Sequence, residues 1–250
     1  MKRSMLFFSL FLAASLSGCS HGNEPLESTE IVKPAQETKV QETTEIPAES
    51  SSEKAISEDG WKQAYIDYIN GNRNTTDTLG SSDMEIYKLV DINGDQIPEL
   101  YINFGTTAGG DIISTFYNGT IVEQTMWNDG FSYIEGQNLF RDSGGHMDEY
   151  YDRIYDIEDG TFVLLHEGEY GAADNASVQF DSNGEPIYQY TWDKKEVSSK
   201  EEYQNLLQAV YDTDQAVSPL DGAEYDSKAG RYVGNGLCDS QEIIEAINAY

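Results

Sequence analysis

Turn-forming dipeptides recur through the middle of the chain and separate short runs rich in β-branched and aromatic residues. Asn-Gly and Asp-Gly suit two-residue hairpins because both central residues can adopt positive φ. The predicted hairpins turn at Asn118-Gly119, Glu135-Gly136, Asp159-Gly160 and Asn183-Gly184. The predicted strands cover 86–90, 100–104, 112–117, 120–127, 131–134, 138–141, 150–157, 161–166, 177–180 and 187–192. Because strands and helices do not alternate regularly, this spacing favours an antiparallel β-meander in one strongly bent sheet over a parallel α/β sheet.

Helical periodicity flanks the predicted sheet on both sides. Trp61, Tyr65 and Tyr68 fall on one helical face, and Asn70-Gly71 provides a stop. Ser199 and Glu202 form a predicted capping box before an amphipathic run, and Asp239 is the predicted cap of a last helix. The sequence therefore predicts one α+β domain over 57–250, with one N-terminal and two C-terminal helices.

The N-terminal segment carries a targeting signal. Lys2 and Arg3 precede the apolar run 5–16, which is too short to span a bilayer permanently. The run ends in Leu16-Ser17-Gly18-Cys19, which resembles the lipobox of bacterial lipoproteins. That resemblance implies a signal peptide over 1–18 and lipid, including palmitate, on Cys19. The membrane anchor would then hold the chain on the outer face of the cytoplasmic membrane. The alternative is an ordinary secretory signal with a chance cysteine.

Residues 19–56 are predicted to be a disordered tether, because they are rich in Glu, Thr, Ser and Pro and contain no aromatic residue. The whole chain has a formal net charge of −30. Loss of residues 1–18 would remove two basic residues and no acids, so the mature chain would be more acidic still. Such a charge excludes a basic patch for nucleic acid. With Cys19 lipidated, Cys238 would have no partner for an internal disulfide.

Oxygen-bearing side chains alternate with other residues between two β-rich runs, in the segment DINGDQIPE at 91–99. Calcium binds six to eight oxygen ligands at about 2.3–2.6 Å, and a curled loop can direct such oxygens to one centre. The predicted calcium ligands are Asp91, Asn93, Asp95, the backbone carbonyl of Ile97, and Glu99. Magnesium and zinc are weaker candidates. The alternative is a plain hairpin turn whose acids face solvent.

This loop resembles those of dockerins, EF-hands and FG-GAP repeats, most closely the nine-residue kind that lies in a β-hairpin. Gly94 stands at the fourth position, whereas an EF-hand has its glycine at the sixth, which is Gln96 here. The twelfth position is Ile102, so the bidentate acid of an EF-hand is missing. Both departures argue against a helix–loop–helix site and favour calcium as a structural staple across a hairpin.

A second group of candidate residues follows in DSGGHMDE at 142–149 and LLHEGEYG at 164–171. If their strands pair across the Asp159-Gly160 turn, five side chains can converge for acid–base chemistry or transition-metal binding. These are His146, Asp148, His166, Glu167 and Glu169. No HExxH motif or nucleophile elbow accompanies them. The alternative is a solvated sheet face.

The chain as a whole resembles uncharacterised surface lipoproteins of Gram-positive anaerobes. LSGC at 16–19, the acidic tether, YKLVDINGDQIPELYI at 87–102 and the tyrosine-rich hairpins carry this resemblance. The function we favour is a cell-surface, extracellular, calcium-stabilised domain that binds a glycan or protein ligand without catalysis. The alternative is a secreted, glycosidase-like hydrolase that uses paired carboxylates. A deep cleft with two acids and a histidine would favour the hydrolase, and a shallow aromatic face would favour binding.

Overall fold

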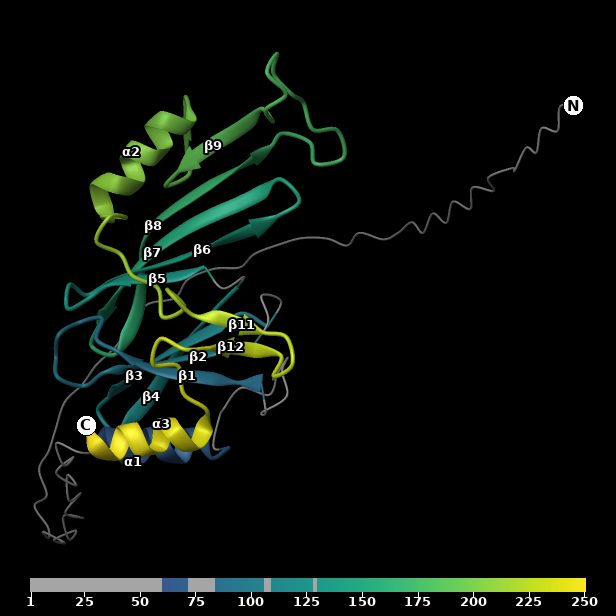
Figure 1. Ribbon diagram of the computed structural model, residues 1–250. Coiled ribbons are helices and arrows are strands. Elements are labelled where there is room, and N and C mark those ends of the chain that lie inside the picture. Colours follow the sequence, from purple (N-terminus) through teal and green to yellow (C-terminus); the bar gives the residue numbers. More distant parts are fainter. Residues whose placement is uncertain (1–59, 72–83, 106–108, 128–129) are drawn as a thin grey trace, which may run out of the picture. The chain divides into compact units, whose positions relative to one another are not determined.

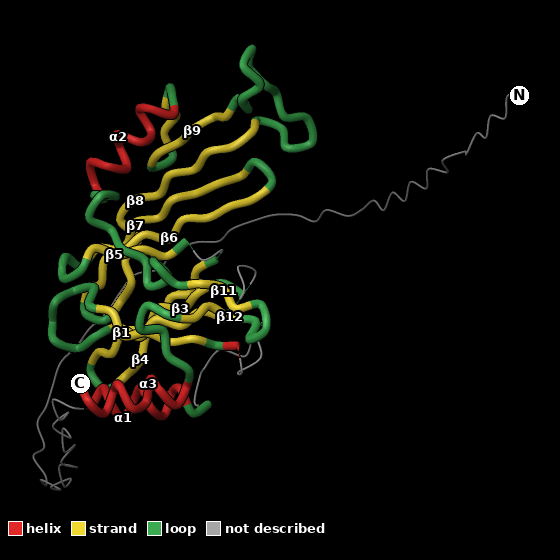
Figure 2. Tube along the Cα trace, in the orientation of Figure 1, coloured by secondary structure: helices red, strands yellow, loops and turns green. Residues whose placement is uncertain are grey.

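The structure, a computed structural model, describes residues 60–71, 84–105, 109–127 and 130–250. All of them belong to one compact unit. The predicted α+β class, with an antiparallel meander, one N-terminal helix and two C-terminal helices, is confirmed (Figures 1 and 2). The predicted signal peptide, the tether and Cys19 lie outside the described residues.

The strands form three sheets in place of one bent sheet, all with antiparallel neighbours. The four-stranded sheet consists, in order, of β1 (Ile86–Val90), β2 (Glu99–Asn103), β3 (Asp111–Tyr117) and β4 (Thr120–Met126). The six-stranded sheet consists of β5 (Phe131–Ile134), β6 (Leu139–His146), β7 (Glu149–Glu158), β8 (Thr161–Ala172), β9 (Tyr188–Trp192) and β10 (Lys195–Val197). A small hairpin pairs β11 (Glu224–Asp226) with β12 (Arg231–Val233). The helices are α1 (Gly60–Ile69), α2 (Lys200–Val210) and α3 (Ser240–Ala249).

Three of the predicted turns connect hairpins. Tyr117 pairs with Thr120 across Asn118-Gly119, and Glu158 pairs with Thr161 across Asp159-Gly160. Asn118 and Asp159 both have a φ of +49°, which matches the positive φ that such turns require. A four-residue turn at 135–138 connects β5 to β6.

At the fourth predicted hairpin the chain does reverse around Asn183-Gly184, where the Ile187 amide donates to the Gln179 carbonyl at 2.8 Å and Phe180 bridges to Pro186. The predicted strand over 177–180 is wrong, because these residues make only that isolated bridge. Because β8 continues to Ala172 and pairs directly with β9, no sheet edge is left for this segment. The sequence prediction also missed the β6–β7 turn at Met147-Asp148, where both residues have positive φ. Met rarely adopts positive φ, so the dipeptide Met147-Asp148 does not have the composition that predicts a turn.

Both C-terminal helices begin at the predicted caps. The Ser199 hydroxyl accepts the amide of Glu202, while the Glu202 carboxylate bonds to Ser198 and not back to Ser199. Asp239 forms a complete capping box with Glu242. Each cap satisfies backbone amides that a helix start leaves without intrahelical partners.

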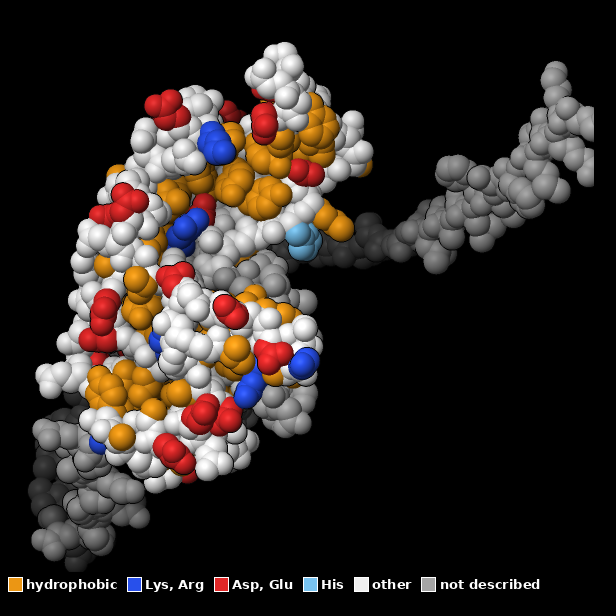
Figure 3. Space-filling view, viewed as in Figure 1, with side chains coloured by type: hydrophobic (Ala, Val, Ile, Leu, Met, Phe, Trp, Pro, Cys, Tyr) orange, Lys and Arg blue, Asp and Glu red, His pale blue; other side chains and the backbone are white. Residues whose placement is uncertain are grey.

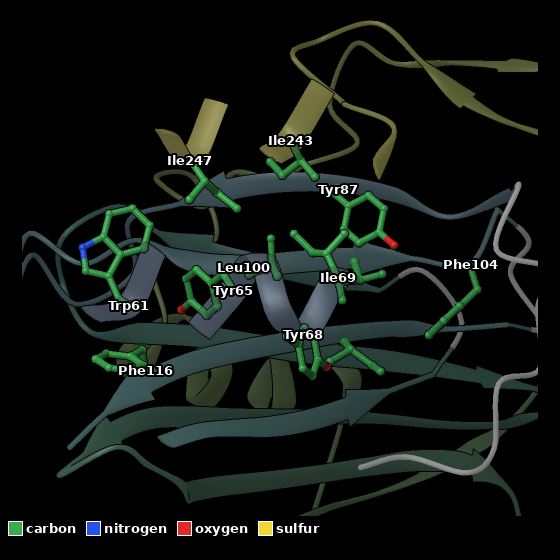
Figure 4. Close-up of a cluster of buried hydrophobic side chains, with 12 residues drawn as sticks. Trp61, Tyr65, Tyr68, Ile69, Tyr87, Leu100, Phe104, Phe116, Ile243 and Ile247 are labelled. Atoms are coloured by element: carbon green, nitrogen blue, oxygen red, sulfur yellow. The ribbon is translucent and has the colours of Figure 1, made fainter. Parts of the chain in front are cut away.

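The hydrophobic core lies in three clusters between successive layers. Helices α1 and α3 cover one face of the four-stranded sheet, as Figure 4 shows for Trp61, Tyr65, Ile243 and Ile247 around Leu100. The other face of that sheet packs against the six-stranded sheet through a cluster that includes Val90, Ile92, Tyr101, Ile113, Phe131, Phe140, Tyr155 and Ile157. Helix α2 packs on the opposite face of the six-stranded sheet through Tyr203, Leu207 and Tyr211.

The core between the two sheets uses only part of β7 and β8. It includes Tyr155 and Ile157 of β7 and Phe162 of β8, which lie near the turn at Asp159-Gly160. Residues 149–153 and 167–171 on the same strands belong to no part of that cluster. The six-stranded sheet therefore presents an uncovered stretch of its inner face beyond the four-stranded sheet.

Gly168 of β8 lies close against Tyr203 of α2 and Trp192 of β9. A Cβ added there would lie 2.4 Å from the Tyr203 hydroxyl and 2.6 Å from Cε3 of Trp192. We therefore expect Gly168→Ala to reduce the free energy of unfolding by about 1–3 kcal/mol through overpacking. Chemical denaturation measures this, with the exposed Glu196→Ala in β10 as control at about 0.5 kcal/mol or less. Equal stability of the two variants would contradict the tight contact.

Candidate functional site

A hollow of about 660 Å³ lies over the uncovered stretch of the six-stranded sheet. Its lining combines aromatic, acidic, basic and amide side chains, chiefly Trp127, His146, Glu149, Tyr151, Arg153, Glu169, Gln189 and Thr191. On the α2 side of this sheet, opposite the hollow, hydrophobic side chains gather beside the helix, and acidic side chains are scattered across the visible surface (Figure 3). The hollow has the size of a small-ligand site.

Strand register brings these side chains onto one face. Tyr151 of β7 pairs with Glu169 of β8, which pairs with Thr191 of β9. Glu149 pairs with His146 across the β6–β7 turn. Alternate residues of a strand point to the same face, so Glu149 lies diagonally next to Glu169 on that face.

A polar network forms one wall of the hollow. The Arg153 Nε donates to Glu167 Oε1 at 2.9 Å, and its guanidinium carbon lies 4.5 Å from the centre of the Tyr151 ring. The Tyr151 hydroxyl donates to Asp142 Oδ1 at 3.2 Å. Burial raises the pKa of Asp142 to about 6, against the opposing effects of the Tyr151 hydrogen bond and the Arg153 charge. This network fixes the orientation of Tyr151 and Arg153.

The five residues of the second predicted cluster do not meet. His146 and Glu169 line the hollow, and Glu167 lies on the same face in its ion pair with Arg153. Asp148, in the β6–β7 turn, accepts the Tyr188 hydroxyl at 2.6 Å. His166 lies on the opposite face, where its Nδ1 is 2.9 Å from Asp193 Oδ2 and its ring stacks on Trp192. Strand alternation separates His166 from its neighbour Glu167.

Six of the chief lining residues are absent from the predicted set, namely Trp127, Glu149, Tyr151, Arg153, Gln189 and Thr191. Glu149 reaches the hollow because the Met147-Asp148 turn folds β7 back beside His146. Trp127 is half exposed at the end of β4, in a different sheet. A correct prediction of the Met147-Asp148 turn would have placed Glu149 beside His146. The position of Trp127, in contrast, depends on how the two sheets pack.

Four of the five predicted calcium ligands lie in the β1–β2 loop, and the fifth, Glu99, is the first residue of β2. Asp91 Oδ1 accepts the Gly94 amide at 2.7 Å, and Asp95 Oδ1 accepts the Ile97 amide at 2.8 Å. The Asn93 amide group donates to Asp95 Oδ2 at 3.0 Å. These bonds hold the side chains of Asp91, Asn93 and Asp95, three of the five predicted ligands, against the loop.

Glu99 has a different environment from the other loop acids, because its side chain is fully buried. One carboxyl oxygen accepts the Ile92 amide at 2.9 Å, and the other accepts the Thr115 hydroxyl at 3.3 Å. Burial raises the pKa of Glu99 from 4.5 to about 8. Both oxygens are thus engaged in the interior.

The loop suits calcium because it offers both carboxylate oxygens and neutral oxygens as ligands. In the ranges that the structure describes, no three His, Cys, Asp or Glu side chains group closely enough to hold a metal. With Glu99 engaged inside, the donors left are two acids, the Asn93 amide oxygen and the Ile97 carbonyl. Calcium accepts such neutral oxygens beside carboxylates. Calcium at this loop therefore stays a prediction.

Comparisons with known proteins return nothing that resembles this chain. No family model matches it, and neither curated proteins nor solved structures give a match. Among the residues described, no helix has the length and apolar character needed to cross a membrane.

The buried Glu99 predicts a specific pH dependence of stability. Between pH 4.5 and 8 the folded protein holds a proton on Glu99 that the unfolded chain has released. The stability that this proton contributes is fully present below pH 4.5 and is lost as the pH rises through 8. In chelator, the stability advantage of wild type over Glu99→Gln should fall by on the order of 2–4 kcal/mol from pH 5 to pH 8.

Denaturant titrations at several pH values measure this difference. Glu158→Gln, which removes an equal charge from an exposed position in β7, is the control for non-specific effects of charge removal. Parallel pH profiles for wild type and Glu99→Gln would show that the folded state does not hold this proton.

Proposed function

We propose that this chain is a cell-surface lipoprotein, anchored through Cys19, whose domain binds an extracellular ligand such as a glycan or part of a protein. The observation that carries the proposal is the hollow on the six-stranded sheet, with aromatic faces next to hydrogen-bonding groups. Aromatic rings provide contact area, and fixed polar groups provide orientation. The Arg153–Glu167 pair and the Tyr151–Asp142 bond support a preformed site, since they hold the wall in place without a ligand.

A hydrolase is the second candidate, because Glu149 and Glu169 are diagonal neighbours with His146 beside Glu149. Carboxylate catalysis of glycoside hydrolysis requires one acid to stay protonated, which an apolar pocket around it achieves. Glu149 and Glu169 are both exposed to solvent, so neither has such a pocket. The exposure of the pair favours binding over hydrolysis.

Trp127 offers a direct test of the hollow as the binding site. A screen of sugars and peptides by thermal shift on the full chain should find ligands that raise the melting temperature. Trp127→Ala should weaken them by tenfold or more, since truncation of a central aromatic anchor costs about 2 kcal/mol or more.

Tyr225→Ala is the matched control, because Tyr225 is 51% exposed against 50% for Trp127 but lies on β11. Its ligand affinities should equal those of wild type. Ligands that bind both variants equally well would place binding elsewhere and remove the hollow as the site.

We also propose that the β1–β2 loop binds calcium through Asp91, Asn93, Asp95 and the Ile97 carbonyl, with Glu99 supporting the loop from inside. The extracellular address that Cys19 predicts would keep even a weak site filled. The ion would supply positive charge between the loop acids and tie the loop together, a structural role without a reaction.

Calcium should raise the melting temperature of the full chain relative to chelator. The stabilisation follows the free calcium concentration and reaches about 2.7 kcal/mol at one hundred times Kd. Asp91→Asn and Asp95→Asn should lose the effect. Asp174→Asn should keep it, because Asp174 caps a similar exposed turn outside the loop. An unchanged melting temperature, together with no calcium bound by calorimetry at millimolar ion, would refute calcium binding.

A further inference from the structure

Among the described residues that line the hollow, Arg153 is the only lysine or arginine, and its charge is already paired with a neighbouring carboxylate. Arg153 donates from Nε to Glu167 at 2.9 Å, and its guanidinium group lies over Tyr151. The Glu167 carboxylate and the Tyr151 ring therefore hold the Arg153 guanidinium group on this face of the sheet. A ligand anion would have to compete with the Glu167 carboxylate for it.

Two acids of the hollow lack such compensation. Glu149 and Glu169 have no ion pair with any residue in the described ranges. Their strand positions, Glu149 opposite Gly171 and Glu169 opposite Tyr151, make them diagonal neighbours. Diagonal Cβ atoms lie about 7–8 Å apart, which allows one cationic group to contact both carboxylates. The carboxylates of Glu149 and Glu169 therefore give the hollow an excess of negative charge.

Two aromatic side chains, Tyr151 and Trp127, line the same hollow as these acids. The Tyr151 ring already bears the Arg153 guanidinium on one face, at 4.5 Å from its centre. Trp127 is 50% exposed and lines the same hollow. Indole is the most favourable aromatic partner for a cation, and the attraction grows as the pair is desolvated.

We propose that the ligand of the hollow is a small organic cation, with an ammonium or guanidinium group bound between Glu149 and Glu169 and its carbon skeleton against Trp127. This inference rests on the hollow being the binding site proposed above and adds the chemical class of its ligand. The volume of about 660 Å³ suits a small molecule.

Isothermal titration calorimetry on the full chain tests the charge requirement with matched pairs of probes. Cadaverine is compared with 1,5-pentanediol, and glucosamine with glucose, while agmatine adds a guanidinium group. Each amine should bind at least tenfold more tightly than its neutral counterpart. The glucosamine arm distinguishes an amino sugar from the two linear amines as the best ligand. Affinity should fall as salt is raised, because salt screens exposed charges.

Single substitutions test where the cationic group of the ligand binds. Glu149→Gln and Glu169→Gln should each weaken amine binding by tenfold or more. Glu158→Gln removes an equal charge from an exposed position at the far end of β7 and should keep wild-type affinity. Melting temperatures of all three variants establish that each is folded.

The possible results separate the two proposals. Neutral probes that bind as tightly as amines, with a loss in Trp127→Ala, would overturn the cation class and keep the hollow as the site. Equal weakening by Glu158→Gln would show non-specific attraction to an acidic protein and overturn the proposal. Amines that fail to bind at millimolar concentration would overturn it as well.

Discussion

The junction between the two large sheets depends on a buried carboxyl group. Glu99 accepts the Ile92 amide at 2.9 Å, and the Ile92 carbonyl accepts the Asn138 amide at 2.6 Å from the β5–β6 turn. The carbonyl of Asp91 accepts the Gly136 amide of the same turn at 3.0 Å. A buried backbone group left without a partner costs about 1–3 kcal/mol, so this chain of bonds holds one sheet against the other. Calcium in this loop would therefore stabilise a joint between sheets as well as a hairpin.

The hollow exists because β7 and β8 are longer than the four-stranded sheet that covers them. Near the Asp159-Gly160 turn their inner face is apolar and buried against Tyr101 and its neighbours. Further along the same face the residues become polar and aromatic, and they line the hollow. Each of these strands thus has one part that packs in the core and one part that lines the hollow. Substitutions at Trp127 and Glu149 should therefore leave the core intact, because both residues stand outside the core clusters.

Local chemistry accounts for the parts of the fold that the sequence predicted correctly. Asn118 and Asp159 tolerate positive φ, and Ser199 and Asp239 cap helices with their own side chains. The predictions failed where distant segments compete. Residues 177–180 resemble a strand, but β9 occupies the edge of β8 that they would need. Met147 adopts a turn conformation that its side chain disfavours, because the pairing of β6 with β7 outweighs the local cost.

The sequence by itself determined the class of the fold, most of the hairpins and the helix starts, since each depends on a few neighbouring residues. It also determined the positions of the loop oxygens from Asp91 to Glu99. Only the tertiary structure decided that Glu99 is buried with a raised pKa, because the Thr115 contact and the surrounding core come from other strands. It likewise brought Trp127, which follows β4, into the same hollow as Glu169 of β8. Strand register and sheet packing create that proximity, and neither is encoded in local spacing.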